Sequence, residues 1–219
     1  MSTEDFQNTM WSNFWTNFEQ GMVFRHASVL EMVSGGKLLD LGCGDGFLMK
    51  LLRSKGIDVE GLDISEEAVK KCQNAGFKAR VFDFSNVPLP FDADSFNYVV
   101  MLDVLEHLYV PESLLEEAKR ISKKYIILSV PNFNSLPARL QVLLGRTPEN
   151  NKPKMGHVYW FNYQVLNSMF AKHNLAIVEM RTNYFWAKAP ILGDVIKFLT
   201  KLMPNIFALS FVVKLEKKK

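Results

Sequence analysis

Three glycines at alternate positions, Gly42, Gly44 and Gly46, follow the apolar run Leu38–Leu41 in this chain. A glycine turn between a buried strand and a helix lets a ligand approach the backbone closely. Asp63 closes a second apolar run, about twenty residues further on, which is the usual distance to a ribose-binding carboxylate. The types and spacing of these residues predict a site for the adenosine end of a cofactor.

The spacing of the glycines indicates which cofactor this is. Dinucleotide-binding turns read G-x-G-x-x-G, whereas Phe47 stands here where the third glycine belongs. Asp40 and Asp45 flank the turn, and no Lys or Arg lies between Lys37 and Lys50. Two carboxylates favour a cationic ligand over a diphosphate. The sequence therefore predicts S-adenosylmethionine, with S-adenosylhomocysteine as product, and disfavours a nucleotide-dependent oxidoreductase.

Further polar residues follow the apolar run at 96–102, namely Asp103, Glu106 and His107. The carboxyl ends of strands in an open sheet face the ligand crevice, so these side chains are expected at the site. His107 is a candidate general base because the unperturbed pKa of histidine lies near neutrality. A hydrogen-bonded structural histidine is the alternative interpretation.

The acidic-apolar-G-x-G-x-G run resembles the first motif of class I S-adenosylmethionine-dependent methyltransferases. The run Leu105-Glu106-His107-Leu108 is similar to one in small-molecule methyltransferases, including those of quinone biosynthesis. The resemblance implies methyl transfer to an O, N or C nucleophile of a small molecule. It also implies these cofactor-binding residues: Asp40, Gly42, Cys43, Gly44, Gly46, Asp63, Ile64, Asp83, Phe84, Leu102, Asp103 and His107.

The expected roles of these residues differ. Asp63 accepts the ribose hydroxyls, and Ile64 packs on the adenine face. By the resemblance, Asp83 takes the adenine amino group and Phe84 packs on the ring, while Leu102 lines the methionine part of the cofactor.

A narrower resemblance rests on Pro131-Asn132-Phe133, Arg139-Leu140-Gln141, Gly145-Arg146 and the later Gly156-His157. These segments are similar to the methionine biosynthesis protein W group. That group is linked to homoserine acyltransferases, so a cofactor-binding partner or regulator in methionine biosynthesis is the alternative function. The residues expected to hold substrate are Trp15, Asn132, Arg139, Arg146, His157 and Tyr184.

Strand-like and helix-like segments alternate along the chain, which is typical of a doubly wound α/β domain. We expect a Rossmann-like, mostly parallel seven-stranded sheet with helices on both faces and an antiparallel last strand. The expected strands are 37–41, 59–63, 78–82, 97–102, 125–130, 176–180 and 207–215. The expected helices are 46–55, 65–74, 111–122, 163–172 and 191–202.

Aromatic residues at helical spacing precede this pattern, among them Trp11, Phe14, Trp15 and Phe18. They predict an N-terminal helical cap at 1–36, followed by the methyltransferase domain at 37–219. An insertion at about 132–160 is long for a compact domain, and we therefore assign it to the substrate region.

The bulk composition narrows the remaining functions. The formal net charge of the 219 residues is only +3, and part of it comes from a terminal lysine run, so nucleic-acid binding is not expected. The two cysteines lack metal-ligand spacing and predict free thiols in a cytoplasmic protein without a metal. We expect no membrane contact and a monomer or homodimer, although an apolar segment at 191–209 leaves peripheral membrane binding open.

Overall fold

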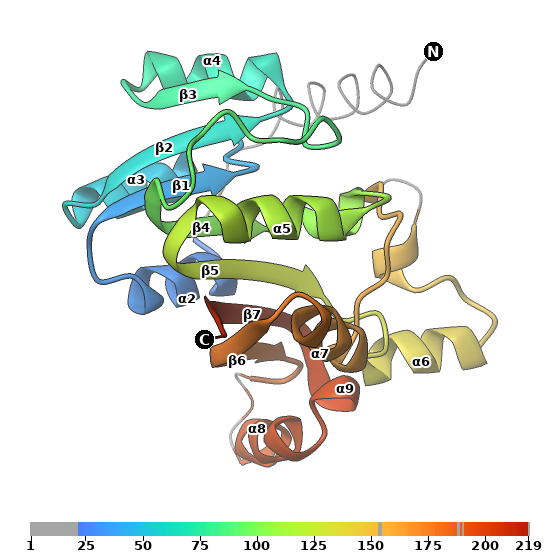
Figure 1. Ribbon diagram of the computed structural model, residues 1–219. Coiled ribbons are helices and arrows are strands. Elements are labelled where there is room, and N and C mark those ends of the chain that lie inside the picture. The colour runs from blue at the N-terminus through green and yellow to red at the C-terminus, as the bar shows by residue number, and fades with distance from the viewer. Residues whose placement is uncertain (1–21, 153–154, 188, 190, 219) are drawn as a thin grey trace. The chain divides into compact units, whose positions relative to one another are not determined.

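The computed structural model describes residues 22–152, 155–187, 189 and 191–218 (Figure 1). The chain divides into two compact units. The first comprises Met1–Leu102 and Leu114–Ile127, and the second comprises Asp103–Ser113 and Leu128–Lys219. Trp15 lies outside the described residues.

The first unit is built on parallel strands. Its β1 pairs with β2 on one side and with β4 on the other, and β2 pairs with β3. Leu38, Leu39 and Leu41 of β1 are fully buried because this strand lies inside the sheet. The strands are β1 (Lys37–Leu41), β2 (Asp58–Asp63), β3 (Lys78–Val81) and β4 (Phe96–Leu102). The helices are α2 (Phe24–Met32), α3 (Phe47–Ser54), α4 (Glu66–Asn74) and most of α5 (Pro111–Ile121).

Local sequence signals set the ends of these helices. The Ser65 side chain accepts a hydrogen bond from the Ala68 amide and caps α4, and Glu66 and Glu67 occupy its first turn, where the helix dipole favours acids. Gly56, at φ +75°, follows the end of α3 and permits the left-handed turn into β2. The helix predicted over 65–74 is thus observed, with Ser65 as its cap.

The second unit contains the end of β5 and an antiparallel pair. β6 and β7 pair along their whole lengths, from Leu175 opposite Lys217 to Tyr184 opposite Ala208. Its strands are β5 (Ser122–Pro131, whose first residues belong to the first unit), β6 (Leu175–Tyr184) and β7 (Ala208–Lys217). Its helices are η1 (Leu105–His107), α6 (Leu136–Leu143), η2 (Glu149–Asn151), α7 (Tyr163–Lys172), α8 (Leu192–Leu202) and α9 (Pro204–Phe207).

The strands form a seven-stranded sheet of order β3-β2-β1-β4-β5-β7-β6. The chain order reverses between β1 and β4, and such a switch point opens a ligand crevice at the carboxyl ends of the strands. The predicted Rossmann-like, mostly parallel sheet with an antiparallel last strand is confirmed. No helix among the described residues has the length and apolar character needed to cross a bilayer.

The segment 132–160, in which no helix is predicted, contains α6 and η2. Only Ala138 of α6 is buried, while Leu140, Leu143 and Leu144 are exposed. The apolar residues of this helix therefore do not mark a buried face, and the sequence pattern gave no helical signal. The division of the chain at residue 36 stays a prediction.

Candidate active site

The glycine turn of the first unit is held against the end of β2. The amides of Gly42 and Cys43 both donate to the Leu62 carbonyl oxygen, at 2.8 and 3.1 Å. Gly42, Gly44 and Gly46 have φ values of +77°, +54° and +82°, which only glycine adopts without strain. Three glycines are thus needed to make this turn.

Asp63 links the end of β2 to the turn. Its Oδ2 accepts a hydrogen bond from the Gly44 amide at 2.8 Å, and its Oδ1 accepts one from the Ser65 amide at 2.9 Å. The side chain is only 6 % exposed. Burial raises its pKa, while the amide donors of Ser65 and Gly44 oppose that rise. Each carboxylate oxygen has a second lone pair, so Asp63 can still accept from a ligand hydroxyl.

Asp40 does not supply the negative charge that the sequence argument gave it. Burial, and then the neighbouring Asp63, raise the pKa of Asp40 to about 8. The carboxyl of Asp40 is consequently mostly protonated at neutral pH. Asp45 precedes α3 and accepts a hydrogen bond from the amide of Phe47, the first residue of that helix, at 3.1 Å. The expectation that Asp40 and Asp45 both carry a negative charge beside the turn is therefore wrong for Asp40.

The two cysteines meet behind the turn. Cys43 Sγ lies 4.0 Å from Cys72 Sγ, and the Cys72 thiol donates to the Gly44 carbonyl oxygen at 3.2 Å. Both cysteines are buried and free. The sequence separates them by 29 positions with no motif, so this contact could not be read from spacing.

Asp83 and Phe84 follow β3 in the first unit. Asp83 Oδ2 accepts hydrogen bonds from Ser85 Oγ at 2.7 Å and from Asn86 Nδ2 at 2.9 Å, which fold the loop on itself. Phe84 is buried, and Ile64 after β2 is half-buried.

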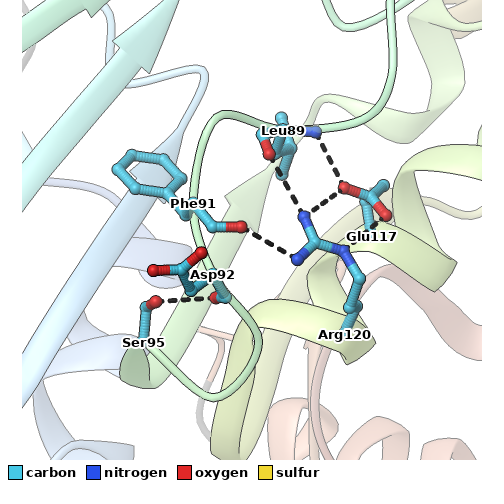
Figure 2. A network of polar contacts seen from close by, with 6 residues as sticks. All are labelled: Leu89, Phe91, Asp92, Ser95, Glu117 and Arg120. Atoms are coloured by element: carbon cyan, nitrogen blue, oxygen red, sulfur yellow. Dashed lines mark hydrogen bonds and ion pairs between the residues drawn. The ribbon is translucent and has the colours of Figure 1, made fainter.

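The remainder of this loop is fastened to α5, as Figure 2 shows. The Arg120 guanidinium pairs with Glu117 through two hydrogen bonds of 2.8 and 2.7 Å. It also donates to the carbonyl oxygens of Phe91 at 2.8 Å and Leu89 at 3.1 Å, and the Leu89 amide donates to Glu117 at 2.7 Å. This network holds the β3–β4 connection in place.

Leu102 ends β4 in the first unit and is half-buried; Asp103 opens the second unit. The Asp103 backbone has φ +54°, an uncommon value for a residue other than glycine. Its amide donates to the Ser129 carbonyl oxygen at 3.1 Å, and its Oδ1 accepts from Ser129 Oγ at 2.5 Å. The end of β5 thus fixes Asp103. Strained backbone of this kind is common at functional sites.

His107 and His157 come together in the second unit, with their ring centroids 4.8 Å apart. His107 Nδ1 lies 3.1 Å from the Gly156 carbonyl oxygen, and His157 Nδ1 lies 2.8 Å from that of Asn150. Burial, followed by the nearby His157, lowers the pKa of His107 to about 4. A ring with so low a pKa accepts a proton weakly, which disfavours the general-base role.

Four further residues expected at the substrate lie among the described residues, Asn132, Arg139, Arg146 and Tyr184. Asn132 is fully buried, and its Nδ2 donates to the carbonyl oxygens of Ala208 at 2.8 Å and Asn205 at 3.1 Å, which favours a structural role. Arg139 and Arg146 are exposed. Tyr184 is half-buried at the end of β6. Their substrate roles stay predictions.

Similar proteins fall among methyltransferases. The chain is 29% identical over 142 residues to the ubiquinone biosynthesis O-methyltransferase of Chromobacterium violaceum, covering 62% of this chain and 60% of that protein. It is 27% identical over 176 residues to the 27-O-demethylrifamycin SV methyltransferase of Amycolatopsis mediterranei, covering 75% of this chain and 65% of that protein. These matches span less than two thirds of either relative.

Solved structures share the fold across the whole chain. Magnesium protoporphyrin IX methyltransferase from Synechocystis, with bound S-adenosylhomocysteine, has a TM-score of 0.69 at 16% identity, with 98% of each chain covered. A possible histamine N-methyltransferase from Thermotoga maritima has a TM-score of 0.62 at 19% identity, also with 98% of each chain covered. The sheet of this chain is thus the class I methyltransferase fold. The model of the methionine biosynthesis protein MetW family matches residues 24–209, and the chain belongs to that family.

Proposed function

We propose that this protein is an S-adenosylmethionine-dependent methyltransferase acting on a small-molecule acceptor. The contact between Asp63 and the Gly44 amide carries the proposal, because it joins a carboxylate at the end of β2 to a glycine turn at the end of β1. An adenosine moiety binds at this place in doubly wound sheets. The missing third glycine, with Phe47 in its place, favours S-adenosylmethionine over a dinucleotide.

The residues of the turn fit such a cofactor. Because the three left-handed residues of the turn are glycines, they expose backbone atoms and no side chains at the end of the strand. Asp63 would hold the ribose hydroxyls, Ile64 and Phe84 would border the adenine, and Leu102 would border the methionine part. When bound, S-adenosylmethionine supplies a methyl group activated by its sulfonium.

Little further chemistry is required of the protein. Holding two reactants in line contributes roughly 7–11 kcal/mol to lowering a barrier, so orientation is the main task of these residues. A base is needed only where the acceptor must lose a proton. The relatives from Chromobacterium violaceum and Actinobacillus pleuropneumoniae are both named ubiquinone biosynthesis O-methyltransferases. These names favour an oxygen nucleophile on the acceptor.

A second candidate function follows from the family. The match of residues 24–209 to a methionine biosynthesis family favours a cofactor-binding partner or regulator of a methionine-pathway enzyme.

The buried free thiols Cys43 and Cys72 fit a reducing compartment, and we place the protein in the cytoplasm on that ground.

Calorimetry tests the cofactor. We expect S-adenosylmethionine and S-adenosylhomocysteine to bind and NAD not to bind. Asp63→Asn should weaken the binding at least about tenfold, since a hydrogen bond to a charged group contributes roughly 1.5–3 kcal/mol. Asp58→Asn, at the exposed start of the same strand, is the matched control and should bind normally. Failure of both adenosyl ligands to bind would refute the proposal.

Transfer of label from methyl-tritiated S-adenosylmethionine to a metabolite extract separates the two functions. An enzyme labels a small molecule, and Asp63→Asn should reduce that labelling at subsaturating cofactor, in line with its weaker binding. Tight cofactor binding with no labelled product in repeated extracts would favour the regulator.

A further inference from the structure

We infer that Glu106, His107 and His157 form a binding site for a divalent transition-metal ion. One donor atom from each of these residues lies within 4.8 Å of the other two. All three belong to the second unit, with Glu106 and His107 on η1 and His157 in the segment after η2. The inference does not depend on the proposed methyltransferase function.

Both imidazole rings have the tautomer that a metal requires. A carbonyl oxygen only accepts hydrogen bonds, so Nδ1 of His107 must donate to Gly156 and Nδ1 of His157 must donate to Asn150. The lone pair of each ring therefore sits on Nε2. Histidines that bind metals in proteins almost always donate their other N–H in this way, to a backbone carbonyl or a carboxylate, which fixes the ring.

Glu106 completes the donor set of the cluster. It is fully buried and places carboxylate oxygens beside the two rings.

Backbone contacts hold the segment of His157 against η1. The amides of Val158 and Tyr159 both donate to the Glu106 carbonyl oxygen, at 2.9 and 3.0 Å. The residues on both sides of His157 are thereby bonded to Glu106 or His107. On its other side, the His157 ring meets the edge of Phe133, with centroids 5.6 Å apart and planes at 81°. The three side chains are therefore preorganised.

The donor set indicates the class of ion. Two imidazole nitrogens and one carboxylate suit Zn²⁺, Fe²⁺ or Co²⁺, whereas Mg²⁺ and Ca²⁺ prefer oxygen ligands alone. Two ligands at typical Zn²⁺ distances lie at most about 4.2 Å apart, so donor atoms as far as 4.8 Å apart must close by at least about 0.6 Å around an ion. Three protein ligands leave a coordination position for water or for a substrate oxygen.

Metal titration of the full chain, after removal of bound ions by a chelator, tests the site. We expect one equivalent of Zn²⁺ by calorimetry, and one equivalent of Co²⁺ with the visible absorption of a low-symmetry site. His107→Gln and His157→Gln should each weaken Zn²⁺ binding at least about 100-fold. His173→Gln is the matched control. His173 caps the end of α7 with its Nε2 3.9 Å from Glu112 and is not part of the cluster, so its replacement should leave the affinity unchanged.

A measurement on the unaltered chain keeps the test decisive if a variant fails to fold. The chain has four histidines. In an NMR titration, one equivalent of Zn²⁺ should shift the ring signals of His107 and His157 and leave those of His26 and His173 in place. Absence of stoichiometric binding, or equal shifts at all four rings, would overturn the inference. No cofactor is present in either experiment, so the outcome is independent of methyl transfer.

Discussion

Gly44 and Asp63 meet across 19 positions of chain, whereas His107 and Gly156 meet across 49. The first contact joins the ends of two adjacent parallel strands, β1 and β2, whose order follows from alternating strands and helices. The second joins a short 3-10 helix to an irregular segment beyond α6. The glycine turn of the first unit is thus set by a local motif, and the histidine cluster of the second unit is set by long-range backbone contacts.

The difference also appears in what each region tolerates. The glycine turn depends on backbone conformation and on buried carboxyl groups, so substitutions there act through strain and charge burial. The second unit depends on side chains that bond distant carbonyls, so substitutions there act through lost hydrogen bonds. The following predictions test this contrast.

The largest effect is expected at Asp40, and it depends on pH. The folded-state pKa of about 8 lies above the ordinary value of 3.8, so the folded chain holds a proton that the unfolded chain has lost. The stability of the unaltered protein therefore falls as pH rises from about 4 to 8, by up to roughly 1.4 kcal/mol per pH unit. Asp40→Asn removes this dependence, so its stability relative to the unaltered chain should improve across that window. Urea unfolding at several pH values measures it, and parallel pH profiles would contradict the assignment.

Gly46→Ala should lower the free energy of unfolding by about 2–3 kcal/mol, because a left-handed residue acquires a Cβ that also needs space. Gly46 has φ +82°, and its Cβ would lie 3.0 Å from Cys72 Sγ. Gly56→Ala is the matched control, at φ +75° with nothing within 4 Å of its Cβ. It should cost only about 1 kcal/mol. Equal losses in denaturant unfolding would show that packing behind the turn is unimportant.

Asn132→Ala tests the second unit. The variant leaves the buried carbonyl oxygen of Ala208 and the half-buried one of Asn205 without their amide donor, which costs about 2 kcal/mol. Arg139→Ala, which removes an exposed side chain bonded to one carbonyl, should change stability by less than about 0.5 kcal/mol. Thermal unfolding of both variants makes the comparison. A neutral Asn132→Ala would remove the case for a structural role and restore the substrate prediction.

Arg120→Ala should have the smallest effect of the four, about 1–2 kcal/mol, because its hydrogen bonds to Glu117 and two carbonyls lie at the half-exposed rim of the first unit. Lys119→Ala, on the same helix with a 3.6 Å ion pair to Glu116, should cost less than about 0.5 kcal/mol. Hydrogen exchange should also rise in the β3–β4 connection of Arg120→Ala alone. Unchanged exchange there would mean that the loop is fixed by other contacts.

Local sequence patterns are sufficient to predict the sheet, the glycine turn and Asp63 at the end of β2. Each of these follows from a local pattern: apolar runs that parallel strands bury, glycines that a left-handed turn requires, and a fixed strand-to-strand distance. The Ser65 cap and the exact span of α7 were likewise local.

Which distant side chains meet, and in what charge state, depends on the tertiary structure. In the folded chain His157 lies beside His107, the free thiols of Cys43 and Cys72 are in contact, and Asn132 donates hydrogen bonds to backbone carbonyls of the α9–β7 region. The fold also keeps Asp40 protonated, because a pKa depends on burial and neighbours that no residue type reveals. Contacts between irregular segments leave no periodic signal in a sequence, because they do not recur at a helical or strand spacing. Which residues make them depends on how the folded chain brings the segments together.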